Sequence, residues 1–226
     1  MTDGLAEVPE YVHEALAARH KAEAAKSSAE ARLNVAAAKI TEIDLAQRAR
    51  IEHDMLTADA YHGVYRFSDV VGDSSVNKCI EQLETWNRQN DLEDTEIIFY
   101  SPGGSILSGF ALWDYLRTYK KNHKLTTTAR GYAASMAGIL LQAGHHRQMG
   151  SESWILIHEG SMGIGGSVGE VEDQVEWSKK LRDRLADILA DRSTLNARQI
   201  KAKWKRKDWW VGSDEALELG FVDEIV

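Results

Sequence analysis

Short apolar runs alternate with amphipathic stretches over most of this chain, from about residue 63 onward. Four runs rich in β-branched and aromatic residues have the length of strands, and the stretches between them repeat their apolar residues at helical spacing. The expected strands are 63–67, 96–100, 124–129 and 154–158, and the expected helices are 75–89, 105–119 and 136–143. Strands that alternate with helices in this way indicate an α/β fold with a stacked parallel sheet.

A longer helix is expected after the fourth strand. A glycine-rich turn over 160–169 leads into a segment over 171–192, in which apolar residues recur every three or four positions. These apolar residues are Val171, Val175, Leu181, Leu185, Ile188 and Leu189. The spacing predicts an amphipathic helix with one apolar face.

The first part of the chain has a different pattern. Residues 7–56 are rich in alanine and charge and nearly free of glycine and proline after Pro9, which predicts one long helix, or two helices broken near Ser27 and Ser28. The apolar residues form only a narrow stripe, so this segment buries too little surface to be a domain by itself. The stripe comprises Leu33, Ala37, Ile40, Ile43 and Ile51. The expected organisation is a helical N-terminal extension, residues 1–60, followed by a folded domain, residues 61–226.

Composition and charge argue against several classes of protein. The 226 residues carry a formal net charge of −8, which disfavours a general nucleic-acid binder. No apolar run approaches the roughly 18 residues of a membrane span, and the start of the chain lacks the basic-then-apolar order of a signal peptide. The lone cysteine, Cys79, excludes an intramolecular disulfide and is expected to be a half-buried packing residue. We therefore expect a cytoplasmic protein with no membrane partner.

Two further clusters could suggest a ligand but favour an ordinary structural role. The basic residues of 201–207, interleaved with Trp204, Trp209 and Trp210, are more typical of a solvated helix end leading into a buried aromatic turn than of a nucleic-acid patch. The adjacent histidines at 145 and 146 do not share a face of a helix or strand, which disfavours a metal site. No metal and no cofactor are expected.

Three places in the sequence have the pattern of an acyl-transfer site. Ser135 stands among small residues in 131–138, where it can occupy a tight strand-to-helix junction with a reachable hydroxyl. Gly103 and Gly104, about thirty residues upstream, let backbone N–H groups approach a substrate, and His158 ends an apolar strand and can act as a general base. Taken singly, the serine fits helix packing, the glycines fit a turn and the histidine fits a structural hydrogen bond. Their order and spacing favour catalysis.

With these motifs the chain resembles the proteolytic subunit of the Clp protease (ClpP), from about residue 65 to residue 226. The resemblance is carried by SPGGS at 101–105, GYAASMAG at 131–138 and ILIHEG at 155–160. It implies a crotonase-like ββα spiral with a protruding handle helix, and a serine endopeptidase that acts on peptides or unfolded proteins inside stacked heptameric rings. The sequence contains no GxxxxGK[ST] motif, so an ATP-dependent unfoldase would be a separate protein.

The resemblance also implies roles for individual residues. Ser135 would be the nucleophile, His158 the general base, and Asp208 a buried acid that fixes the imidazole tautomer. The backbone N–H groups of Gly104 and Met136 would form the oxyanion hole. The resemblance alone selects Asp208, because its local sequence indicates only a surface aspartate.

The chain departs from the family next to the histidine and at its N-terminus. Family members usually have a proline shortly after the histidine, whereas this chain has Glu159 and Gly160. Glycine is expected to loosen the site, and the added negative charge is expected to disfavour acidic substrates. A peptide is expected to add as a strand along 104–107, so the expected substrate-binding residues are Ser105, Ile106, Glu159 and Gly160. Family members also usually have a short N-terminal segment in place of a long helical extension.

Several alternatives share part of this pattern. The same chemistry could serve a virus-encoded or otherwise specialised relative, such as a capsid-maturation protease whose helical extension binds an assembly partner. An inactive structural ring subunit is disfavoured by the presence of the serine, histidine and aspartate. A crotonase-type acyl-CoA enzyme would share the fold without needing this serine and base, and a serine–lysine peptidase would not need His158.

Overall fold

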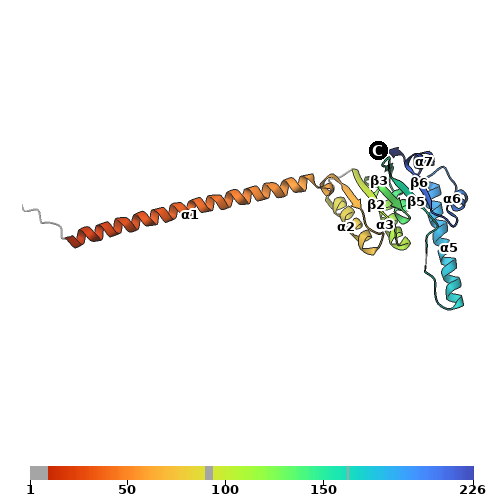
Figure 1. Ribbon diagram of the computed structural model, residues 1–226, viewed down its shortest axis with the longest axis horizontal. Coiled ribbons are helices and arrows are strands. Elements are labelled where there is room, and N and C mark those ends of the chain that lie inside the picture. The colour runs from red at the N-terminus through yellow and green to blue at the C-terminus, as the bar shows by residue number, and fades with distance from the viewer. Residues whose placement is uncertain (1–9, 90–93, 162) are drawn as a thin grey trace, which may run out of the picture. The chain divides into compact units, whose positions relative to one another are not determined.

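The computed structural model describes residues 10–89, 94–161 and 163–226 (Figure 1). Its internal contacts divide the chain into two compact units, of which the first ends at Thr57 and the second begins at Ala58. Residues 1–9 of the expected N-terminal extension and residue 162 of the expected glycine-rich turn lie outside the described residues.

The first unit is one helix. Helix α1 runs over Glu10–Thr57, 48 residues long, with no buried residue. The chain therefore takes the first of the two expected arrangements, and no break occurs at Ser27 and Ser28. Alanine-rich flanks explain this continuity, because a serine in a helix interior costs only a fraction of a kcal/mol relative to alanine, roughly 0.5. The apolar stripe is open to solvent, with Leu33 69% and Ile40 68% exposed.

The second unit is built on a seven-stranded sheet. The strands lie in the order β1-β2-β3-β4-β7, with β5 beside β3 and β6 beside β5. All pairs are parallel except β5 with β6. The strands are β1 Val64–Phe67, β2 Asp94–Ser101, β3 Lys124–Ala134, β4 His146–Met149, β5 Trp154–Ile157, β6 Trp209–Gly212 and β7 Glu224–Ile225.

The long strand β3 pairs with three other strands and divides the sheet. Its first half, from Thr126 to Ala129, pairs with β4, while its last residues, from Tyr132 to Ala134, pair with β5. Gly131 lies between the two halves with φ +77°, in the left-handed region that glycine adopts readily. A side chain there would also meet the Tyr100 ring at 2.9 Å. The division places the end of β3 beside the end of β5, where the expected catalytic residues lie.

Helices cover the sheet and complete the core. They are η1 Asp59–His62, α2 Asp73–Gln89, α3 Ile106–Tyr119, α4 Met136–Leu141, α5 Val168–Asp191, α6 Ala197–Trp204 and α7 Ser213–Glu218. Helix α5 begins with a capping box between Ser167 and Glu170. Its buried residues lie between Leu181 and Leu189, whereas its first turns are largely exposed, and Figure 1 shows these turns extending away from the sheet. This is the expected protruding helix.

The expected strands and helices are all present, which confirms the mixed α/β fold with a parallel sheet. Helix α3 begins at Ile106 because the Ser105 side chain caps it by accepting the Ser108 N–H at 3.2 Å. Five elements were not expected, namely η1, β4, β6, α7 and β7, and only the end of α6 was expected. With α6 included, they have two to eight residues each, too few for a hydrophobic period to be recognised. Of the helices the structure describes, none is long and apolar enough to cross a membrane.

The lone cysteine, the tryptophans near 204–210 and the adjacent histidines differ in burial and in their contacts. Cys79 is fully buried rather than half-buried, and burial raises the pKa of its thiol. Trp204 and Trp209 are buried, while Trp210 is 46% exposed, so the aromatic turn is buried only in part. His145 and His146 point to different partners, because Nδ1 of His145 accepts the Leu125 N–H and Nε2 of His146 lies 2.9 Å from Glu224.

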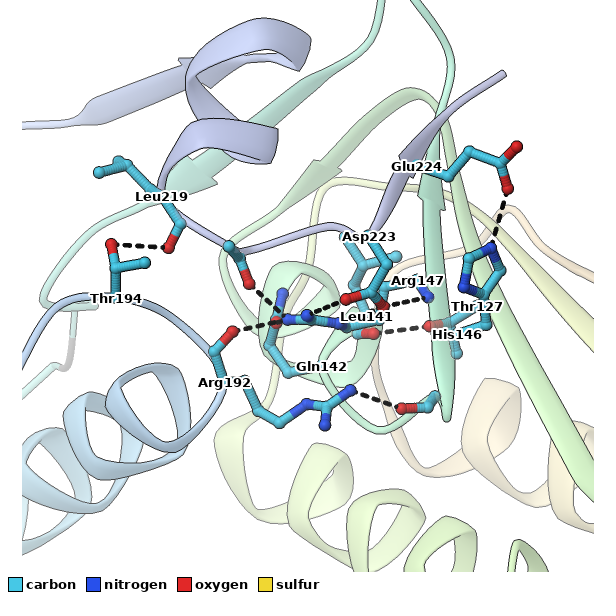
Figure 2. A network of polar contacts seen from close by, with 12 residues as sticks. Thr127, Leu141, Gln142, His146, Arg147, Arg192, Thr194, Leu219, Asp223 and Glu224 are labelled. Atoms are coloured by element: carbon cyan, nitrogen blue, oxygen red, sulfur yellow. Dashed lines mark hydrogen bonds and ion pairs between the residues drawn. The ribbon is translucent and has the colours of Figure 1, made fainter.

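A buried arginine ties the C-terminal segment to the core (Figure 2). The Arg147 side chain donates to both carboxylate oxygens of Asp223 and to the carbonyl oxygens of Arg192 and Gly220. It also donates to Oε1 of Gln142, the residue that ends α4, at 2.9 Å. Burial by itself raises the pKa of Asp223, but the hydrogen bonds from Arg147 outweigh it and hold that pKa below its ordinary value. One side chain thus joins the ends of α4 and α5 to the last strand.

Candidate active site

Ser135 lies at the junction between β3 and α4. Its backbone has φ 55° and ψ −124°, a conformation that residues with a side chain rarely adopt. The backbone N–H of Ser135 donates to the Leu156 carbonyl oxygen at 2.8 Å, so β5 holds the serine in place. A strained strand-to-helix turn of this kind exposes the hydroxyl of a nucleophilic serine.

Gly103 is packed against this turn. A β-carbon at Gly103 would lie 2.7 Å from the Ser135 Cβ and 2.8 Å from the Met136 nitrogen, and its φ is +81°. Only glycine fits both the space and the backbone conformation. The close approach brings the 102–104 loop next to the serine and explains why paired glycines stand upstream in the sequence.

His158 lies directly after β5 and faces Ser135. The parallel register pairs Ala134 with Leu156, which places the residues that follow each strand side by side. Nε2 of His158 lies 2.6 Å from Oγ of Ser135, within hydrogen-bond distance. This is the arrangement in which an imidazole can accept the proton of an attacking hydroxyl.

Asp208 is the nearest carboxylate to the other side of the imidazole. It lies in the loop between α6 and β6, and its Oδ1 is 3.8 Å from Nδ1 of His158. The separation is that of an ion pair rather than a hydrogen bond. The expectation that this carboxylate is buried is wrong, because 63% of its side chain is exposed. The loop over 205–208 lies at the surface, and only the tryptophans on either side of it are buried.

The two residues expected to supply oxyanion N–H groups, Gly104 and Met136, line the same cavity as Ser135. Met136 is the first residue of α4, so its N–H has no acceptor within the helix. Val71 donates to the Gly103 carbonyl oxygen and accepts from the Ser105 N–H, both at 2.8 Å. In a parallel pairing these two bonds direct the N–H of Gly104 away from Val71.

A cavity of about 340 Å³ opens beside the serine and histidine. It is lined by Ser135 and His158 and by four residues that were expected near the substrate, namely Gly104, Ile106, Met136 and Gly160. Its apolar wall comprises Ile139, Leu156, Ile157, Leu185 and Trp204. Leu185 and Trp204 come from α5 and α6, far away in the sequence, and no local motif marks them as part of the site.

The expectation of a free strand edge for the substrate is wrong. Residues 104–107 are not a free strand edge, because Ser105 caps α3 and the helix occupies Ile106 and Leu107. Glu159 does not line this cavity but borders a smaller one, of about 30 Å³, together with Ile106, Gly160 and Ser161. Its carboxylate accepts the Arg206 backbone N–H at 2.9 Å and lies 3.4 Å from Nη1 of Arg182, so its charge is balanced by a guanidinium.

Comparison with known proteins agrees with this geometry. The Clp protease family model matches residues 58–226, the whole second unit. The ATP-dependent Clp protease proteolytic subunit 2 of Tropheryma whipplei is 31% identical over 159 residues, which cover 70% of this chain and 87% of that protein. The ATP-dependent Clp protease proteolytic subunit of Deinococcus radiodurans is 32% identical over 152 residues, covering 66% and 73% respectively. Subunit 3 of Rhodococcus jostii is 31% identical over 158 residues, covering 69% and 77%. This chain therefore belongs to the Clp protease family and is a ClpP-like serine peptidase.

Proposed function

We propose that the protein hydrolyses peptide bonds with Ser135 as nucleophile, His158 as general base and Asp208 as the acid that orients the imidazole. The observation that carries this assignment is the 2.6 Å contact between Nε2 of His158 and Oγ of Ser135 at a strained strand-to-helix turn. The membership in a family of serine peptidases supports the same assignment.

The geometry is compatible with a two-step acyl transfer. Oγ of Ser135 attacks the peptide carbonyl carbon while Nε2 of His158 takes the hydroxyl proton. The negative oxygen that forms is stabilised by the N–H groups of Gly104 and Met136. His158 then returns its proton to the leaving amine, and the acyl group stays on Ser135. A water molecule, deprotonated by His158, hydrolyses this ester and restores the free serine.

Replacement of Ser135 by alanine tests the nucleophile. Ser135→Ala is expected to lower kcat on a fluorogenic peptide by on the order of 10⁶ and to abolish covalent labelling by a fluorophosphonate probe. The peptide should carry an apolar residue before the scissile bond, because the cavity wall is apolar. Ser161→Ala is the matched control, since Ser161 also lines the cavity but is distinct from the serine that contacts His158. Unchanged turnover in Ser135→Ala would refute the mechanism, and a wild-type protein that the probe does not label would favour an inactive structural subunit.

The names of the relatives suggest the context of this activity. Those relatives are proteolytic subunits of ATP-dependent proteases. We propose that this chain is likewise a cytoplasmic subunit of stacked heptameric rings that degrade peptides or unfolded proteins delivered by a separate ATP-dependent unfoldase. Electron microscopy of the purified protein tests the architecture: sevenfold stacked rings are expected, and monodisperse monomers would contradict it.

The N-terminal extension is assigned an assembly role. We propose that residues 1–60 are an extension and 61–226 the peptidase domain, and that α1 packs on a neighbouring subunit or an assembly partner. Helix α1 has no buried residue, whereas helices in proteins gain most of their stability from packing an apolar face against other elements. A chain that starts at Ala60 is expected to fold, to keep Ser135 reactive toward the probe and to change its sedimentation. Loss of folding would place α1 in the core, and unchanged assembly together with unchanged protein degradation would exclude the proposed role.

A further inference from the structure

We propose that Glu159 is a positioning residue that holds the 205–208 loop, and with it Asp208, against His158. The inference rests on the triad proposed above. Glu159 follows the histidine directly in the sequence, and the residue it binds, Arg206, lies two positions before Asp208. A single carboxylate therefore connects the segment that carries the base with the segment that carries the acid.

The contact of Glu159 is with the backbone of the loop. Oε1 of Glu159 accepts the N–H of Arg206 at 2.9 Å. Arg206 has φ 56°, in the left-handed region that residues with a side chain disfavour. Such a conformation persists only where the surroundings hold it. The bond from Glu159 supplies that restraint at the strained residue itself.

The rest of the loop has few anchors. Trp204 and Trp209 are buried at its two ends, while residues 205–208 are exposed. The Lys207 N–H donates to the Trp204 carbonyl oxygen at 3.2 Å, which is a bond within the same turn. This internal bond shapes the turn but does not attach it to the strand that carries His158. Two contacts make that attachment: Trp209, at the end of the loop, pairs with Ile157 of β5, and Glu159 binds the middle of the loop at Arg206.

Charge reinforces this arrangement. Glu159 borders a second cavity, of about 290 Å³, together with four cationic side chains and Trp204. The cations are Arg182, Lys201, Lys205 and Arg206. Arg182 pairs with Glu159 at 3.4 Å and Lys201 pairs with Asp183 at 2.9 Å. Removal of the Glu159 charge leaves the guanidinium of Arg182 facing the cationic loop, a repulsion that solvent screens and that is smaller than the loss of the hydrogen bond.

This geometry predicts a specific kinetic effect. Glu159 does not line the cavity beside Ser135, although it borders a small adjoining cavity with Ile106 and Gly160, so its loss is expected to change KM less than kcat. Glu159 acts by positioning Asp208, which orients the catalytic imidazole, so its loss is expected to lower kcat. An amide at position 159 can still accept the Arg206 N–H, so Glu159→Gln is expected to retain most of the effect of the glutamate.

A double-mutant cycle in the full-length protein tests the inference. In steady-state kinetics on the fluorogenic peptide, Glu159→Ala and Asp208→Ala are each expected to lower kcat about tenfold. The double variant should be no slower than Asp208→Ala alone, because the acid that Glu159 positions is already absent. Glu159→Gln should lie within about threefold of the wild type. Glu176→Ala, which removes an exposed carboxylate from α5, is the control and should leave kcat unchanged.

The outcomes separate this inference from the proposed function. Fluorophosphonate labelling at Ser135, together with a slow Asp208→Ala and a Glu159→Ala of wild-type rate, would overturn the role of Glu159 while keeping the triad. Losses of kcat that multiply in the double variant would also overturn it, since Glu159 would then act independently of Asp208. A wild-type rate in Asp208→Ala would remove both the proposed acid and the role of Glu159. Circular dichroism and sedimentation of each variant identify any loss that comes from misfolding.

Discussion

The two sides of the His158 imidazole differ in how the protein holds its neighbours. Ser135, on one side, stands between buried residues of β3 and α4 and lies 2.6 Å from the imidazole. Asp208, on the other side, lies in an exposed loop at 3.8 Å. The hydrophobic core and the sheet register determine the serine's position, whereas the aspartate is held by the pairing of the next residue, Trp209, with β5 and by polar contacts at the surface.

This difference indicates which part of the mechanism is permanently assembled. Close packing leaves the serine turn no alternative arrangement, since an added methyl group at Gly103 would already collide with it. The aspartate loop can move without opening the core, because only its two ends are buried. We therefore expect changes near Ser135 to cost far more activity than changes near Asp208.

The largest loss of activity is expected when Ser135 or His158, the pair held by the core, is replaced. His158→Ala should lower kcat by on the order of 10⁶, similar to Ser135→Ala, because the two residues act as a unit. The double variant should be scarcely slower than either single one, because the second change removes a partner whose role is already lost. Single-turnover peptide hydrolysis measures these rates. Multiplicative losses would mean that the serine and histidine work independently.

A smaller but still large effect is expected from an added methyl group behind the serine. Gly103→Ala should lower kcat/KM by about 10²-fold or more, since it displaces Ser135 and the Met136 N–H by a fraction of an ångström or more. Gly72→Ala is a matched control, because a β-carbon there would meet nothing within 4 Å. The rate of fluorophosphonate labelling gives the comparison directly. Equal rates for the two variants would show that the serine turn is not tightly held.

On the exposed side of the imidazole, a smaller effect is expected. Asp208→Asn should lower kcat about tenfold, well below the roughly 10⁴-fold loss seen when the buried aspartate of a trypsin-like triad is changed in this way. The reason is that water competes with an exposed carboxylate for the imidazole. Asp214→Asn, which removes another exposed carboxylate, serves as the control. A loss of 10⁴-fold would instead mean that Asp208 becomes buried when substrate binds.

The smallest effect concerns stability, through the buried arginine that supports the core side of the site. The pKa of Asp223 is lowered in the folded protein by Arg147, so the ionised carboxylate stabilises the fold. This contribution is fully present above the ordinary pKa of 3.8 and is lost as the pH falls through the lower pKa of the folded state. Urea unfolding of the wild type and Asp223→Asn should therefore differ at pH 7 and begin to converge only as the pH falls below the ordinary pKa of 3.8. Asp173→Asn, on the exposed part of α5, should show no such convergence, and a constant difference for Asp223→Asn would contradict the assignment.

Local patterns in the sequence were sufficient to predict the framework of the fold and half of the site. Strands and long helices follow from hydrophobic periods that act over a few neighbouring residues, and this is why β2, β3, β5 and α5 were expected where they occur. The serine among small residues, the paired glycines and the histidine at a strand end are likewise local features. Local patterning could not predict β4, β6 and β7, whose short segments pair with distant parts of the chain.

The remaining half of the site depends on tertiary structure. The sequence by itself determined that Ser135 and His158 end neighbouring apolar segments, and a family resemblance selected Asp208. Only the tertiary structure decided that Asp208 lies 3.8 Å from the imidazole, that Leu185 and Trp204 form part of the cavity wall, and that Glu159 binds the Arg206 backbone. The physical reason is that these contacts join segments more than twenty residues apart, and their geometry depends on how the sheet and helices pack rather than on any local preference.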